Sequence, residues 1–74
     1  MQITVNGQAT DVPEGTTVAQ LLERLGVVPE RVVVEMNLAI VKRERRAAAV
    51  LQSEDVVEIV QFVGGGACVV PFAD

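Results

Sequence analysis

Residues 56–63 are a nearly continuous apolar segment that reads Val56-Val57-Glu58-Ile59-Val60-Gln61-Phe62-Val63. Such a run is typical of a central strand that is buried on both faces of a sheet. Near the other end of the chain, residues 2–5 alternate polar and apolar and are followed by Asn6-Gly7. This pair tolerates the positive φ angles of a tight turn, so residues 2–12 are predicted to form a β-hairpin. We expect the first and the last of these strands to lie side by side in mid-sheet.

Between them, residues 17–26 carry the signals of one short helix. The segment Thr17-Val18-Ala19-Gln20 has the form of a capping box, so a helix is predicted to begin near Val18. Its apolar residues fall on one face at helical spacing, namely Val18, Leu21, Leu22 and Leu25. Gly26 suits the left-handed position that ends a helix. The pattern predicts an amphipathic helix that packs on a sheet.

The remaining segments complete an α+β fold. Residues 32–36 are rich in β-branched residues and predict a strand, and residues 38–41 predict a weaker one. The segment 42–50 is ambiguous, although its three alanines favour a helical turn, and residues 53–55 predict a tight turn. This order of elements predicts a β-grasp, or ubiquitin-like, fold: a mixed sheet of about four to five strands on one main helix.

Composition excludes several classes of function. The chain has 74 residues, no His, one Cys and a net charge of −4, so we expect one small domain that holds no metal and is not an enzyme. The acidic balance disfavours nucleic acid and anionic membranes as partners. No signal peptide or membrane-spanning segment is readable, and the sequence therefore predicts a cytoplasmic protein.

A break in composition occurs at Gly64-Gly65-Gly66. We expect residues 1–66 to form the domain, with residues 64–66 as a flexible arm and residues 67–74 as an apolar extension. A glycine arm lacks Cβ atoms, so it can enter a narrow enzyme channel and present a terminal carboxylate to the α-phosphate of ATP. The alternative for the triplet alone is a plain linker.

The order and spacing of these segments resemble the ThiS family, the sulfur carriers of thiamine biosynthesis. The resemblance covers residues 1–66 and rests on residues 1–7, Thr17-Val18, Leu21-Leu22, residues 34–37 with Ile40-Val41, Glu54-Asp55, and residues 57–66. It implies that Gly66 is adenylated by an E1-like enzyme that uses ATP and is then converted to a thiocarboxylate, with Gly65 as its obligatory neighbour. The implied partners are that enzyme, a thiazole synthase and a sulfur donor such as a cysteine desulfurase. The carrier itself is expected to bind no cofactor and to catalyse nothing.

The chain departs from this family because Gly66 is followed by Ala67. The carbonyl of Gly66 is therefore part of an amide and cannot be adenylated until the bond to Ala67 is cut. Some relatives are made as precursors whose tail a peptidase removes, and this explanation suits residues 67–74. The alternatives are a variant that never conjugates, or an artificial extension.

Three further features have competing interpretations. Phe62, beside the glycine arm, is a candidate for partner docking or else an ordinary core residue. Cys68 stands two residues beyond Gly66, which suggests a role in sulfur transfer; the alternative, no role, is favoured because Cys68 lies in the extension and nothing cationic nearby would activate its thiol. Four of the six basic residues, Lys42, Arg43, Arg45 and Arg46, cluster around Glu44 and predict a solvated face or a docking surface.

Two alternative functions remain open at this stage. One is a sulfur carrier for another pathway, such as the molybdenum cofactor or a cysteine-forming route, which shares the same chemistry. The other is a ubiquitin-like binding module that keeps its tail and makes only non-covalent contacts.

Overall fold

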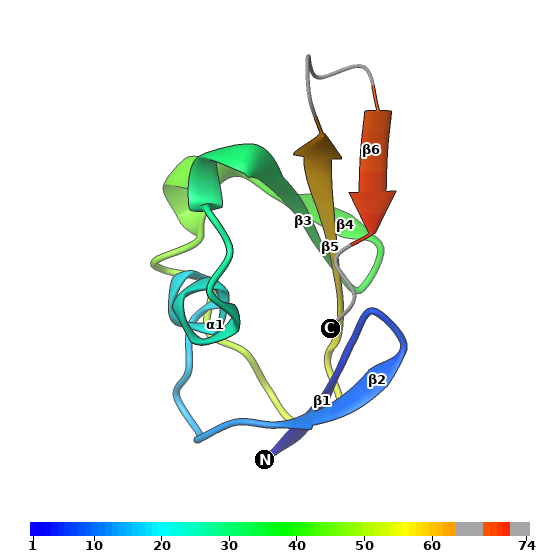
Figure 1. The fold of residues 1–74 in the computed structure, drawn as a ribbon. Coiled ribbons are helices and arrows are strands. Elements are labelled where there is room, and N and C mark those ends of the chain that lie inside the picture. Colours follow the sequence, from blue (N-terminus) through cyan, green and yellow to red (C-terminus); the bar gives the residue numbers. More distant parts are fainter. Residues whose placement is uncertain (64–67, 72–74) are drawn as a thin grey trace.

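The computed structural model describes residues 1–63 and 68–71, with side chains described as far as Gln61. One α-helix lies against one face of a sheet that both ends of the chain help to build (Figure 1). In chain order the elements are β1 (Gln2–Val5), β2 (Gln8–Asp11), α1 (Val18–Leu25), η1 (Pro29–Arg31), β3 (Val32–Met36), β4 (Ala39–Val41), η2 (Arg43–Arg45), β5 (Val56–Val63) and β6 (Cys68–Pro71). Neither α1 nor the short η helices of these described ranges are long and apolar enough to cross a membrane.

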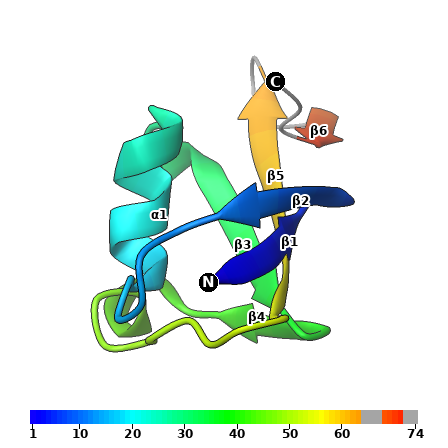
Figure 2. The same ribbon diagram turned by 90° about the horizontal axis from the view of Figure 1, so that it is seen from below.

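The sheet has the strand order β2-β1-β5-β3-β4. Strands β1 and β5 run parallel, whereas the other neighbours along this path pair antiparallel. Figure 2 shows α1 running along one face of the sheet. The predicted mixed sheet on one helix is confirmed, and so is the central position of both β1 and β5. The sequence did not predict β6, which pairs antiparallel with β5 outside this path.

The first hairpin turns at Asn6 and Gly7, as predicted. Both residues have positive φ angles, 50° and 83°, and the register places Val5 opposite Gln8. Two consecutive positive φ angles define the turn whose twist matches that of the flanking strands. The Asn-Gly pair therefore fixes the register of β1 and β2.

The helix is also capped as its sequence indicates. The Thr17 side chain accepts from the backbone N–H of Gln20, whose side chain accepts from the backbone N–H of Thr17. Gly26 ends the helix with φ 73°. The helix contributes Val18, Leu21 and Leu22 to a core that also contains Ile3, Val5, Val12, Val32, Val34, Leu51, Val57 and Ile59. This core is entirely aliphatic.

The prediction that β5 is buried on both faces is wrong for the part whose side chains are described. Val57 and Ile59 face the helix and are fully buried, whereas Val56 is 44% exposed and Glu58 is exposed. The reason is that α1 covers one face only, so alternate residues of the strand meet either the core or solvent. An apolar residue such as Val56 on the second face does not require burial.

The segment 42–50 contains a helical turn. The turn begins before the three alanines on which its prediction was based. Residues Arg43–Arg45 form η2, and Ala48 donates its backbone N–H to the Arg45 carbonyl to continue the turn. Val50 then forms an isolated bridge with Thr17 next to the helix start. This loop is therefore tied to α1 at its far end.

Two asparagine side chains hold β5 in place. Asn6 accepts from the Ile59 N–H at 2.8 Å and donates to the Ile59 carbonyl at 3.2 Å. On the other side of β5, the Asn37 side chain accepts from the Val56 N–H at 2.9 Å, and the Asn37 backbone N–H donates to the Val56 carbonyl at 2.7 Å. Each side chain supplies bonds that a neighbouring strand would otherwise make.

We expect Asn6→Gly to lower the free energy of unfolding by about 1–3 kcal/mol, because glycine keeps the positive φ but leaves the buried Ile59 backbone groups without partners. In a domain of this size that is a fall in melting temperature of at least about 4 °C. Gln8→Ala, at an exposed position of the same hairpin, is the matched control. Equal melting temperatures for Asn6→Gly and the parent would contradict this role.

Candidate functional site

The candidate site lies at the carboxyl end of β5, where the central strand leaves the sheet. Its amino-terminal half is held on both sides: Val56 and Val57 pair with β1, and residues 57–61 pair with β3. Pairing with β1 stops there, so the second half of β5 extends beyond β1, as Figure 1 shows. Whatever follows Val63 is thus attached to the best-supported strand of the fold.

Beyond β1, the free edge of β5 is occupied by β6. The register places Val60 opposite Pro71 and Val63 opposite Cys68. Strand β6 therefore takes up the same side of β5 that β1 occupies lower down. Residues 68–71, which follow the glycines in the chain, are in this way part of the sheet.

Most of the residues predicted to carry the chemistry lie outside the part of the chain that the structure describes. Gly64, Gly65 and Gly66 lie outside the described residues. Phe62 belongs to β5, but its side chain lies outside the described part, as does the Cys68 thiol in β6. The assignments of Gly66 and Phe62 stay predictions.

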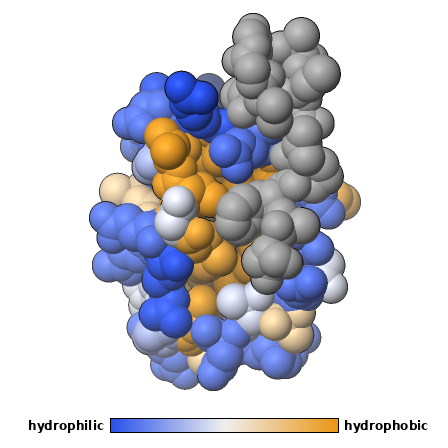
Figure 3. Space-filling view, in the orientation of Figure 1, coloured by the Kyte–Doolittle hydropathy of each residue, from blue (hydrophilic) through white to orange (hydrophobic). Residues whose placement is uncertain are grey.

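Apolar surface gathers between α1 and β5, with polar residues on either side (Figure 3). The helix has only 8 residues, so it covers the core incompletely. Several apolar residues packed against the core are only partly buried, among them Met1, Leu25, Val27, Met36, Val41 and Ala49. A partner could bury these side chains at little cost in conformational entropy, because packing against the core already orders them.

The four basic residues of the cluster separate into two pairs. Arg46 is 6% exposed and donates to the carbonyls of Pro29 at 2.9 Å and Val32 at 2.8 Å. Burial, and to a smaller extent the charge of Arg43, lowers the pKa of Arg46. Arg43 donates to the Glu30 carbonyl at 3.2 Å. These two arginines fasten the η2 loop to the loop before β3.

The other two, Lys42 and Arg45, are exposed, and within the described part of the chain no hydrogen bond or ion pair engages the side chain of either residue. The sequence interpretation of a solvated face or docking surface therefore applies to this pair, whereas Arg46 is a structural residue. Composition alone could not separate them, since the two kinds alternate within a short run. No cluster of three or more Cys, Asp or Glu side chains that could hold a metal occurs among the described residues.

The architecture and the site define a class of protein: a β-grasp domain whose central strand β5 leads into a glycine triplet. A family model for the ThiS family matches residues 2–66. The chain belongs to the ThiS family, which includes the sulfur carrier protein ThiS of Escherichia coli.

Individual relatives agree with this assignment. The sulfur carrier protein ThiS of Escherichia coli is 36% identical over 66 residues, which cover 89% of this chain and 100% of the relative. A crystal structure of the thiamine biosynthesis protein ThiS from Geobacter metallireducens superimposes with a TM-score of 0.78 at 39% identity, covering 89% of this chain and 100% of that one.

Two further relatives are much longer proteins. The chain is 47% identical over 66 residues to a thiazole synthase of Magnetococcus marinus and 39% identical to one of Paramagnetospirillum magneticum. In both comparisons the match covers 89% of this chain and 20% of the relative. The chain thus spans about a fifth of the length of these relatives.

We expect Arg46→Met to destabilise the fold by about 1–3 kcal/mol, because the carbonyls of Pro29 and Val32 lose their donors while the apolar stem is kept. Arg45→Met is the matched control, and its exposed side chain should change the unfolding free energy by less than about 0.5 kcal/mol. Urea denaturation of both variants measures the difference. Similar midpoints for the two variants would show that Arg46 does not fasten the loops.

Proposed function

We propose that this domain carries sulfur as a thiocarboxylate on Gly66. The observation that carries the proposal is that the family match begins at residue 2 and ends at residue 66, the third glycine. The E. coli carrier supports it, since its whole length corresponds to 66 residues of this chain. The pairing of the first half of β5 with β1 and β3 also suits the role, because it anchors the strand from which the arm extends toward another protein.

The chemistry requires a free carboxylate at Gly66. Hydrolysis of the bond between Gly66 and Ala67 supplies it and releases residues 67–74. The carboxylate then attacks the α-phosphorus of ATP in the adenylating enzyme, which gives an acyl adenylate and pyrophosphate. The terminal sulfur of a persulfide on the donor protein displaces AMP and forms an acyl disulfide. A thiol then attacks the donor's inner sulfur, which releases the thiocarboxylate on Gly66 and leaves the thiol and the donor cysteine joined as a disulfide. The domain supplies the carboxylate and its presentation, and its partners supply the catalysis, in the cytoplasm where ATP is available.

The acceptor of the sulfur in this proposal is a thiazole synthase. The similarity to two proteins named thiazole synthase supports it, because in them the matching segment belongs to the same polypeptide as the rest of that protein. A carrier for the molybdenum cofactor or for cysteine would share the carboxylate chemistry, and this similarity favours the thiazole route over both.

We expect the 74-residue chain to be inert with the adenylating enzyme and a chain ending at Gly66 to be active, since only the shorter chain has the carboxylate. The measurement is ATP–pyrophosphate exchange, with intact mass determined before and after the assay. Robust exchange by a chain whose tail is still present would refute the proposal. The same outcome would remove the need for a tail-cutting peptidase.

In the shortened chain, Gly65→Ala and Gly66→Ala should slow thiocarboxylate formation at least tenfold while leaving the melting temperature unchanged, because a Cβ would crowd a narrow enzyme channel. Leu22→Ala should have the opposite profile. Its side chain is 1% exposed, and removing a buried leucine side chain costs about 2–5 kcal/mol. A glycine variant that unfolds as early as Leu22→Ala would contradict the assignment of the arm.

A further inference from the structure

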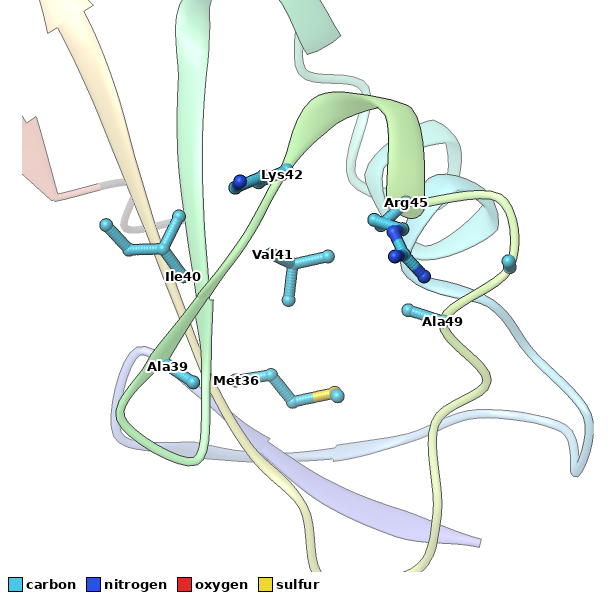
Figure 4. A pocket seen from close by; sticks show the side chains of 8 residues that line it. Met36, Ala39, Ile40, Val41, Lys42, Arg45 and Ala49 are labelled. Carbon is cyan, nitrogen blue, oxygen red and sulfur yellow. The ribbon is translucent and has the colours of Figure 1, made fainter.

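A hollow opens at the far edge of the sheet, between the β3–β4 hairpin and the segment that follows it. It has a volume of about 430 Å³. Its walls are formed by Met36, Ala39, Ile40, Val41, Lys42, Arg45, Ala48 and Ala49. Figure 4 shows Met36 and Val41 on the hairpin side and Arg45 and Ala49 on the opposite segment.

The floor of the hollow continues the core. Val41 pairs with Val34 and Ala39 with Met36, so these side chains lie on the face of the sheet that α1 covers. Val34 is fully buried, but Met36 and Val41 are only partly buried. Strand β4 is an edge strand of the sheet, and the apolar face of the sheet at β4 is therefore exposed to solvent.

The charge around the hollow is the opposite of that of the chain. The chain has 10 acidic residues and a net charge of −4, yet none of the eight lining residues is acidic. Two of them are the exposed cations Lys42 and Arg45, the members of the basic cluster whose charged groups no described residue engages. The chemical complement of this site is an apolar side chain next to carboxylates.

The surroundings favour a protein over a small molecule. Leu38 is 94% exposed at the hairpin turn and Ile40 is 64% exposed beside the hollow, so apolar surface continues past its rim. Surface of this kind on a small protein marks a protein contact. In addition, Met36 pairs with Val57 at the start of β5, whereas the glycines follow its end. The two sites are thus about 20 Å apart along β5, at about 3.3 Å per residue, and a large partner could engage both.

We propose that this hollow docks an acidic segment of the thiazole synthase, with an apolar side chain in the hollow and carboxylates on Lys42 and Arg45. The proposal rests on the proposed function for its choice of partner. Docking at this end of β5 leaves the glycine arm free to enter the active site of the same partner. Contacts in the hollow would provide affinity and orient the carrier on its partner, and the arm would extend from β5 to the active site.

The test uses the chain ending at Gly66 and the thiazole synthase of the same organism, with binding measured by titration calorimetry. The Lys42→Glu/Arg45→Glu double variant should raise the Kd at least tenfold. The control is Arg24→Glu/Arg31→Glu, which changes two exposed cations outside the hollow by the same charge. It should change the Kd less than about threefold, and melting temperatures should confirm that both double variants are folded.

The outcomes separate this inference from the proposed function. If the parent chain binds and both double variants weaken binding equally, or neither does, the hollow is not the docking site while the partner assignment stands. If the parent chain does not bind the synthase, both the assignment and the hollow proposal fall. If the hollow variant instead abolishes self-association of the carrier in sedimentation, the occupant is a second copy and the proposal is wrong.

Discussion

The support of β5 from both sides is the constraint on which the rest of the structure depends. Its neighbours β1 and β3 belong to different hairpins, and each hairpin turn contributes an asparagine that bonds the β5 backbone. Asn6 and Asn37 both adopt positive φ, 50° and 53°, which asparagine tolerates better than most residues. The same two residues therefore make the turns and hold β5 between the two hairpins. The helix then needs to cover only one face of a sheet that is already in register.

The features that could be predicted from sequence are those decided by short segments. Asn6-Gly7 specifies its turn through local φ preferences, and Thr17 with Gln20 specifies the helix start through bonds within four residues. The burial of Val56 was mispredicted because it depends on whether anything covers the second face, which hydropathy alone cannot tell. The hollow was missed for a related reason, since it forms between the β3–β4 hairpin and the segment that follows it, and hydropathy does not show how these two segments lie.

The glycine triplet and the family resemblance allowed the candidate site to be predicted from sequence. Comparison with relatives confirms the family. The assignment of Gly66 remains a proposal that the truncated chain can test. The basic cluster shows what sequence cannot resolve: Arg45 and Arg46 are neighbours of the same residue type, yet Arg45 is exposed, whereas Arg46 is buried and donates to the carbonyls of Pro29 and Val32. Consecutive residues of a helical turn point in different directions, so Arg46 at the end of η2 faces the loop before β3 while Arg45 faces solvent.

The pairing of β6 with β5 has a consequence for the proposed cleavage. Along β5 the backbone groups of alternate residues point to the same side, and those of Val57 and Ile59 point toward β1. By this alternation, the groups of Gln61 and Val63 point toward β6. A chain that ends at Gly66 has no β6, so these N–H and C=O groups become an open sheet edge, which is a template for another strand. Hydrolysis of one bond would then create both the reactive carboxylate and an open strand edge that can pair with a partner. Until that bond is cut, the tail would prevent both from forming.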